Sequence, residues 1–401
     1  MTHKNVRLLL IGLSYLGFVS LGLPDGLHGI AWPSIRTSFH LPLDALGKLL
    51  VSFTCGYLLS SFNSGRLLAR LGVGVLLALS CLATAASLLG YALAPGWWVM
   101  VGWGLLAGLG AGAIDAGLNL YAATHFSARM VNWLHACYGF GATGGPVLMT
   151  GVLNTGHSWR WGYAVVGLAQ LVLAVCFGLT HKQWAQHPVA PETAAPVGVP
   201  QASTRSTLSV PIMWLSIAVF FLYTGLEAAA GAWAYSLFTE ARGIPVVTAG
   251  TWVSLYWGVF TTGRVISGLV VGFASVPSLL RYCISGMALG ALLLWLPPSR
   301  EAGFLGLACM GFAAAPVFPS LIATTPGRLG AMHTANGVGI QIAAAVLGGS
   351  LLPALLGIFA DHIGLEVIGP GLFVVALLLL ILHEALIAQS AKSLHQASGT
   401  V

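Results

Sequence analysis

The chain has 401 residues, of which 57% are hydrophobic and 6% are charged, and its mean hydropathy is +0.89. A soluble domain carries about 25% charged residues, so this composition excludes a soluble protein and indicates one that crosses a bilayer many times. The net charge of +6 is spread thinly, without a Lys/Arg cluster, so nucleic acid is not an expected partner.

Apolar runs of about 20 residues or more, enough to cross a bilayer, recur twelve times. The first six are expected near residues 8–35, 44–68, 73–94, 97–124, 131–155 and 159–180. The other six are expected near residues 211–238, 246–272, 276–297, 302–325, 332–360 and 366–389. The sequence therefore predicts an all-α membrane protein with twelve transmembrane helices.

Between the two sets of six lies a stretch rich in Pro, Ala, Ser and Thr, which is typical of a flexible linker. We expect six-helix bundles at residues 1–181 and 210–401, joined by a cytoplasmic linker at 182–209. With both termini in the cytoplasm, eleven Lys and Arg residues lie inside and five outside. This follows the positive-inside rule and predicts that orientation in a bacterial inner membrane.

The two predicted bundles look like copies of each other. Asn132 stands 13 positions before Gly145, and Asn336 stands 13 positions before Gly349, a shift of 204 residues. The same shift puts Pro319 opposite Asp115, so that acid belongs to the first half alone. We therefore expect two pseudo-symmetric bundles with unequal roles, as in transporters built from repeats.

The stretch at residues 104–119 combines an acid and an amide with closely spaced glycines. Gly104, Gly108 and Gly112 repeat every four residues, which lets a neighbouring helix approach closely. Asp115 and Asn119 lie four residues apart, and so share another face. An intramembrane acid costs several kcal/mol unless it faces a cavity or a partner, which makes Asp115 a candidate functional residue.

Of the ten acids, three fall in mid-helix positions: Asp25, Asp115 and Glu227. Glu384 lies near the end of the last helix, where it can reach the interface. Asp25 follows Pro24, which loosens the helix. A poorly solvated carboxylate favours its neutral form, so we expect Asp25 and Asp115 to couple transport to protons. The alternative for each is a structural acid bonded to a neighbouring helix.

Other polar and aromatic residues are candidates for binding a sugar. Amides can both donate to and accept from a hydroxyl group, and Tyr223 lies one turn before Glu227. Each of these residues could instead join helices together. The candidates are Asn119, Tyr223, Glu227, Asn132, His135, Trp252, Tyr256, Asn336 and Gln341.

Several of these motifs resemble a known family. Residues 65–72, which read Gly-Arg-Leu-Leu-Ala-Arg-Leu-Gly, resemble the loop signature of the major facilitator superfamily, with Ala69 in place of its acid. Asp25, Asp115 and the Tyr223–Glu227 pair resemble the fucose permease branch, which carries fucose, galactose and glucose with protons. The resemblance implies the major facilitator fold and a gating role for Gly65, Arg66, Arg70 and Gly72.

No Walker loop, HExxH, CxxC or GxSxG motif is present, so we expect neither an enzyme nor a cofactor or metal site. The leading hypothesis is proton-coupled uptake of a small neutral monosaccharide by a monomer in the lipid bilayer, through alternating access. The alternative is a proton-coupled exporter of drugs or metabolites, because residues 139–146 resemble part of an antiporter signature. A sensor on a transporter scaffold is a third hypothesis, which the mid-helix acids disfavour.

Overall fold

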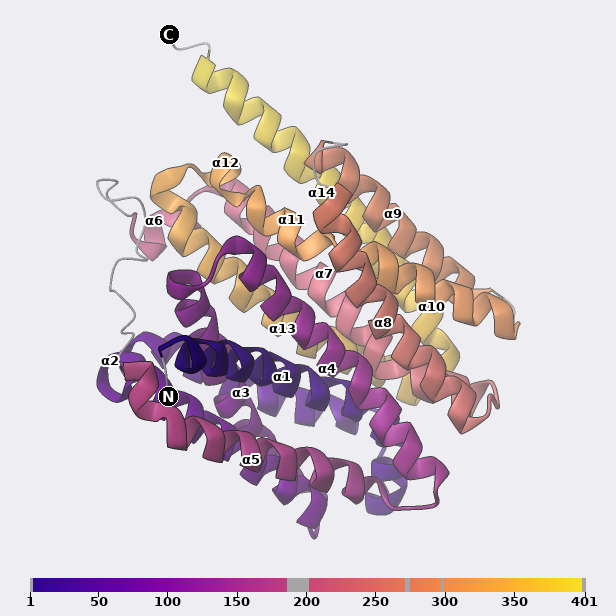
Figure 1. Ribbon diagram of the computed structural model, residues 1–401. Coiled ribbons are helices and arrows are strands. Elements are labelled where there is room, and N and C mark those ends of the chain that lie inside the picture. The colour runs from indigo at the N-terminus through magenta and orange to yellow at the C-terminus, as the bar shows by residue number, and fades with distance from the viewer. Residues whose placement is uncertain (1–2, 186–201, 271–274, 297–298, 399–401) are drawn as a thin grey trace. The chain divides into compact units, whose positions relative to one another are not determined.

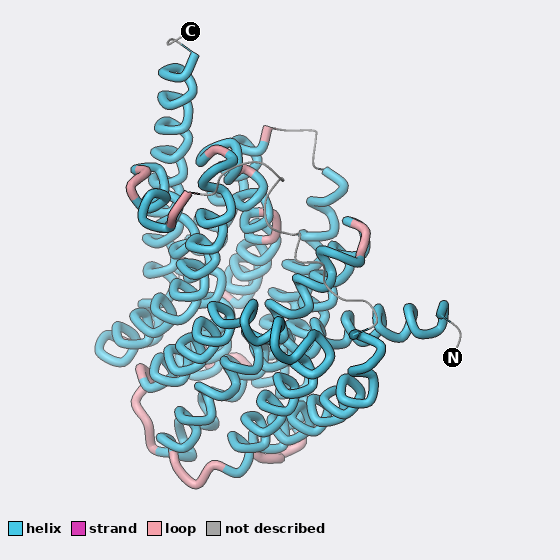
Figure 2. The backbone as a smooth tube through the Cα atoms, turned by 90° about the vertical axis from the view of Figure 1, so that its left-hand side faces the viewer, coloured by secondary structure: helices cyan, strands magenta, loops and turns pink. Residues whose placement is uncertain are grey.

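A computed structural model describes residues 3–185, 202–270, 275–296 and 299–398, which form helices and no strand (Figure 2). By their contacts, they fall into two compact units. Unit 1 contains residues 1–193 and 238–258, and unit 2 contains residues 194–237 and 259–401. The units are defined by contacts between residues, whereas the bundles are predicted from the apolar runs of the sequence. The boundaries of the units and of the bundles therefore differ.

Unit 1 consists mainly of five long helices (Figure 1). They are α1 (His3–Phe39), α2 (Ala45–Leu93), α3 (Trp97–His125), α4 (Ala128–Asn154) and α5 (Trp159–Ala185). The unit also holds most of the π-helix η1 (Leu237–Ala241) and the first half of α8 (Val246–Val270). An ion pair between Arg36, near the end of α1, and Glu240 contributes to that grouping.

Unit 2 consists of the second half of α8 together with the remaining helices. The longer ones are α7 (Pro211–Ser236), α9 (Val276–Trp295), α10 (Arg300–Ala314), α13 (Ala331–Ile363) and α14 (Ile368–Ser398). The shorter ones are α6 (Thr204–Leu208), α11 (Val317–Ala323), α12 (Thr325–Leu329) and the 3-10 turn η2 (Leu365–Val367). Of the predicted linker, residues 186–201 lie outside the described residues, and α6 occupies part of the rest.

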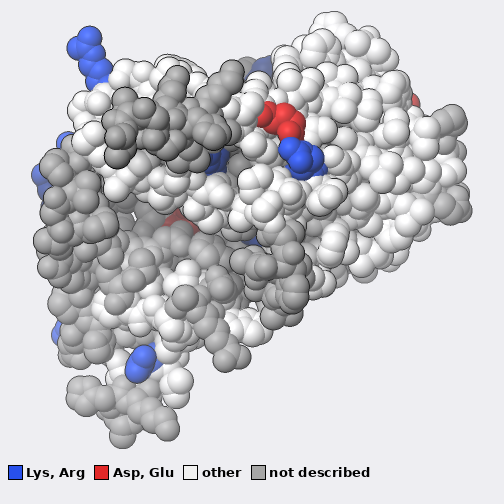
Figure 3. Space-filling model, turned by 90° about the horizontal axis from the view of Figure 1, so that it is seen from above, with Lys and Arg blue, Asp and Glu red and all other residues white. Residues whose placement is uncertain are grey.

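The helices account for twelve membrane spans. Nine helical stretches of the described chain are long and apolar enough to cross a bilayer. One of them, the 49-residue α2, is long enough for two spans and is divided at Gly72. Helices α4 and α8, with 27 and 25 residues, supply the remaining two. The surface also fits a membrane, because charged side chains are few on the face in Figure 3. The predicted all-α membrane fold is confirmed.

Three spans differ from their predicted form. The second and third spans run on as one element, α2, whose helical geometry is interrupted at Gly72 alone. The single helix predicted at 302–325 is instead broken into α10 and α11. The break falls at Pro316, because proline has no N–H for the helical hydrogen bond.

The interruption of α2 depends on a conformation that only glycine adopts easily. Gly72 has φ +71° and ψ 166°, and a Cβ there would meet nothing within 4 Å. Gly72→Ala should therefore lower the free energy of unfolding through backbone strain alone, by about 1–3 kcal/mol. Denaturant titration of the purified protein measures this change. Gly65→Ala, at a helical residue of the same segment that also has open space around it, is the control and should not destabilise. Equal stability of the two variants would contradict the strain argument.

Helices α1 and α4 pack with their backbones in close contact. A Cβ added at Gly22 or Gly26 of α1 would overlap the Tyr138 carbonyl or the Pro146 ring of α4. One added at Gly141 would overlap the backbone of α1 in turn. The close approach therefore requires glycine from both helices, and it fixes the position of every side chain that α4 presents beside α1.

The glycines of residues 104–119 let a neighbouring helix approach closely, as the sequence predicts. A Cβ at Gly108 would overlap the Phe53 carbonyl of α2, and one at Gly112 would overlap the backbone and hydroxyls of residues 57–61. At Gly104 the neighbouring Leu49 side chain would lie 3.0 Å away. The predicted close approach of a neighbouring helix is confirmed, and it holds α3 against the first arm of α2.

Unit 2 repeats the pairing of α1 with α4, because α7 packs closely against α13. A Cβ at Gly348 of α13 would overlap the Phe221 carbonyl of α7, and one at Gly225 would crowd Leu352. Under the 204-residue shift, α7 corresponds to α1 and α13 to α4. The same pairs of helices therefore meet within each unit, as an internal repeat requires.

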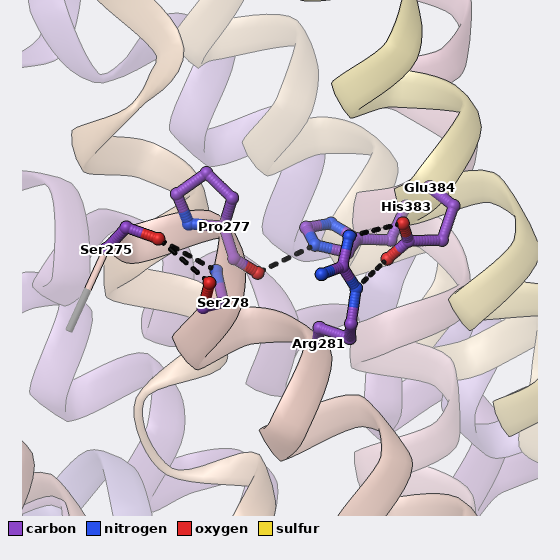
Figure 4. Close-up of polar contacts among 6 residues, drawn as sticks. All are labelled: Ser275, Pro277, Ser278, Arg281, His383 and Glu384. Carbon is purple, nitrogen blue, oxygen red and sulfur yellow. Dashed lines mark hydrogen bonds and ion pairs between the residues drawn. The ribbon is translucent and has the colours of Figure 1, made fainter.

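Glu384 of α14 has a direct partner rather than only the membrane interface. Arg281 of α9 donates two hydrogen bonds to its carboxylate, at 2.7 and 2.6 Å (Figure 4). Beside them, His383 approaches the Pro277 carbonyl at 3.5 Å. Because the paired side chains are 48% and 41% exposed, water screens the pair and its contribution to stability is small.

Candidate functional site

The first part of the candidate site surrounds Asp115 on α3. The phenol of Tyr57, on α2, donates a hydrogen bond to Asp115 Oδ2 at 2.6 Å. The Asn119 amide donates to Asp115 Oδ1 at 2.8 Å, as the four-residue spacing on one helix face allows. Both carboxylate oxygens therefore have a donor within unit 1.

The second part is Asp25, midway along α1. The phenol of Tyr138, on α4, donates to Asp25 Oδ2 at 2.7 Å. The glycine contacts between α1 and α4 bring this phenol within reach, because Gly22 packs on the carbonyl of the same Tyr138. Asp25 is exposed, whereas its neighbours Gly26 and Leu27 are buried.

The two carboxylates belong to one polar face of unit 1. Asp25 and Asp115 lie close enough for an electrostatic interaction, and Tyr57 interacts with both acids. Facing an acid towards lipid costs several kcal/mol. An exposed acid in the middle of a span is therefore expected to border water. Chemically, this face can hold a proton on either acid and offers the Asn119 amide to a hydroxyl-bearing ligand.

Two phenols of this face, on Tyr57 and Tyr138, are not among the predicted site residues. Each sits in an apolar helix at a partly buried position. A buried phenol needs a hydrogen-bond partner, and Asp25 and Asp115 are the mid-helix acids of the first half. That requirement is the signal in the sequence that could have identified both phenols.

Glu227 and Tyr223 form a separate polar group in unit 2. Tyr223 is fully buried and donates to the Ala314 carbonyl at 2.8 Å. The partners of Glu227 are Tyr223, through a side-chain hydrogen bond, and Arg264, through charge. Arg264 also lies over the Phe260 ring, 4.2 Å from its centre. Glu227 thus has a cation nearby, which neither Asp25 nor Asp115 is seen to have.

The two amides of α13 are bonded within unit 2. Asn336 donates to the Ala202 carbonyl, just before α6. Gln341 is fully buried and accepts a hydrogen bond from the Thr325 hydroxyl at 2.9 Å. Neither amide is brought to Asp25 or Asp115 by these bonds, and their contact with substrate stays a prediction.

The remaining candidates are aromatic or lie at helix ends. His135 is exposed and meets the Phe18 ring edge-on at 5.2 Å between centres. Trp252 meets Phe238 at 5.1 Å, and Tyr256 is buried. The side chain of Asn132 lies outside the described residues. The structure places Gly65, Arg66, Arg70 and Gly72 as exposed residues around the interruption of α2.

Several proteins of known name are similar to this chain. A yeast protein named Bypass of stop codon protein 6 (Saccharomyces cerevisiae) is 23% identical over 88% of this chain and 77% of its own length. Sodium-dependent glucose transporter 1 of Danio rerio is 24% identical over 86% of this chain and 63% of its own. A glucose/galactose transporter of Brucella abortus is 23% identical over 52% of this chain and 48% of its own. The chain thus spans between about half and three quarters of these relatives.

Solved structures share the fold. The nucleoside transporter NupG (D323A mutant) superposes with a TM-score of 0.76 at 14% identity, over 95% of this chain and 99% of its own. A D-xylose-proton symporter gives 0.70 at 16% identity, over 93% and 97%. FucP, in its outward conformation, gives 0.65 at 13% identity, over 94% and 98%. At these identities, the likeness establishes the fold.

The family is established by sequence. The family model described as Major Facilitator Superfamily matches residues 14–338, most of the chain. The resemblance recognised in the loop at residues 65–72 and in the mid-helix acids is thereby confirmed for the superfamily, and FucP stands among its structural neighbours. The chain belongs to the major facilitator superfamily and is a multi-pass membrane transporter, not an enzyme.

Proposed function

We propose that this transporter takes up a small neutral monosaccharide together with protons, by alternating access. The observation that supports it most is the polar face of unit 1, where Asp25 and Asp115 each accept a phenol hydrogen bond and Asp25 is exposed in mid-helix. One relative is named a sodium-dependent glucose transporter, another a glucose/galactose transporter, and one structural neighbour is named a D-xylose-proton symporter.

Asp25 and Asp115 would couple the proton to the sugar. With a proton bound, the pair loses negative charge, which lowers the cost of closing the site away from water. Loss of the proton on the opposite side then restores charge and favours release. A proton can drive the cycle only through its different affinity for two states of the protein, and acids whose partners are neutral phenols and an amide allow such a difference.

The chemistry of the polar face suits an uncharged substrate. Its described groups are carboxyl, phenol and amide, which match the donor and acceptor needs of sugar hydroxyls. Glu227 belongs to unit 2 and has the cation of Arg264 nearby. We assign Glu227, with Tyr223, to substrate binding.

Export is the weaker proposal. Its support is the glycine-rich segment at residues 139–146, which resembles part of an antiporter signature. In the structure, Gly141 and Gly145 of this segment provide the close contact with α1. That packing accounts for these glycines without an antiport cycle.

Purified protein in liposomes tests the proposal. Labelled glucose, galactose, xylose and fucose are offered with acid outside, with equal pH, and with sodium outside at equal pH. We expect at least one sugar to accumulate above equilibrium with acid outside, and none with equal pH. Accumulation with sodium alone, or loss of a preloaded cationic drug with acid outside, would refute proton-coupled sugar uptake.

We further propose that the protein is a monomer in a bacterial inner membrane, with both termini in the cytoplasm.

A further inference from the structure

Unit 1 has an open groove of about 360 Å³ on its side, between the two arms of α2 and α3. Leucines are half of the residues that line it, including Leu67, Leu71, Leu79 and Leu109. Leu71 and Leu79 are 38% and 50% exposed, so the groove is accessible from outside the unit. A groove of this kind in a membrane-spanning unit faces hydrocarbon rather than water.

The polar residues in the wall do not make the groove polar. Ser60 donates to the Tyr57 carbonyl at 3.1 Å, and Ser80 donates to the Leu76 carbonyl at 2.7 Å. Asn63 donates to a carbonyl of its own helix at 2.8 Å. Because these donors are used within their helices, the groove suits an alkyl chain rather than a sugar.

One end of the groove is basic. Leu67 and Leu71 line it beside the interruption of α2, and Arg66 and Arg70 are exposed on the same turns of that helix. No acid in the described ranges forms an ion pair with either guanidinium. Ala69 stands where the similar loop signature has an acid, so this segment carries no counter-charge of its own. The positive end therefore complements an anion.

We propose that an anionic phospholipid occupies this groove, with one acyl chain against the leucines and its phosphate on Arg66 and Arg70. Guanidinium groups bind phosphate oxygens with paired, charge-assisted hydrogen bonds, and basic residues at a helix end attract anionic lipids. The lipid would also touch α3 through Gly110 and Ala113, within five residues of Asp115. This site is distinct from the polar face, and the proposal is independent of the substrate.

Native mass spectrometry of the full chain in detergent tests the site. Phosphatidylglycerol and phosphatidylcholine with identical acyl chains are titrated separately. We expect phosphatidylglycerol to bind more tightly. Arg66→Gln with Arg70→Gln should weaken it by about fivefold per arginine, and weaken phosphatidylcholine less, because its choline group offsets the charge of the phosphate. Lys48→Gln, an exposed cation at the other end of the first arm of α2, is the matched control and should change neither lipid.

A second variant tests the groove itself. Ala83→Trp places an indole among the leucines, and should weaken both lipids by filling the space of the chain. Equal binding of the two lipids by the natural protein, or unchanged phosphatidylglycerol binding in the double arginine variant, would overturn the proposal. Because both arginines are exposed, that variant should fold whether or not Ala83→Trp does. Weakening of both lipids alike by the arginine variant would refute the preference for an anionic headgroup.

Discussion

Asp115→Asn is expected to abolish accumulation of sugar driven by a proton gradient, so that the internal sugar concentration never exceeds the external one. Asparagine has the shape of aspartate and can still accept a hydrogen bond from Tyr57, which donates to the natural carboxylate at 2.6 Å. It cannot exchange a proton, so the coupling is lost while the site keeps its form. The measurement is uptake into liposomes with acid outside.

Exchange of labelled for unlabelled sugar at equal pH separates coupling from binding. We expect Asp115→Asn to retain this exchange, because it needs no net proton movement. Asp44→Asn is the matched control, since Asp44 is an acid that lies outside the spans, just before α2, and it should keep gradient-driven accumulation. Full accumulation by Asp115→Asn would remove Asp115 from the proposed mechanism.

Gly22→Val is expected to cause a large loss of stability. Its side chain would overlap the Tyr138 carbonyl and lie against the backbone of Ala142. Backbone cannot move aside as a flexible side chain can, so α1 and α4 must separate. The cost should be about 3 kcal/mol or more, and the Asp25 to Tyr138 hydrogen bond should be lost with the contact.

The measurement is the free energy of unfolding from denaturant titration in detergent, together with sugar uptake by whatever protein remains folded. Gly12→Val is the control, because Gly12 lies on the same helix, is exposed, and has nothing within 4 Å of its Cβ position. It should change stability little. If both variants were equally stable, the tight packing of α1 on α4 would be wrong.

The fold could be predicted from hydropathy because each span carries its own signal. An apolar run of about 20 residues must form its hydrogen bonds internally, and so becomes a helix. The form of the interruptions was harder to predict than their place. Gly72 separates two spans without ending α2, because a single residue of unusual φ suffices for the change of direction. Pro316 breaks the tenth span although the hydropathy continues across it.

The sequence predicts those site residues whose place in the membrane costs free energy. It does not predict those whose role depends on contacts between helices. Asp25 and Asp115 stood out, because a mid-bilayer acid is expensive wherever it points. Tyr57 reaches Asp115 only because α2 packs closely on α3, a contact between segments far apart in the sequence. Gln341 matched the expected residue type, but in the structure it is buried against Thr325. The spacing of residues along one helix cannot distinguish a side chain that reaches the site from one that is buried between helices.

The division of the tenth span at Pro316 leaves a weak point in unit 2, between α10 and α11. Proline has already removed a helical hydrogen bond there, so further bending costs less than in an intact helix. The Ala314 carbonyl before the break is held by Tyr223 of α7, which makes that phenol the natural pivot. At this point α11 can bend relative to α10 while α10 stays packed on α9.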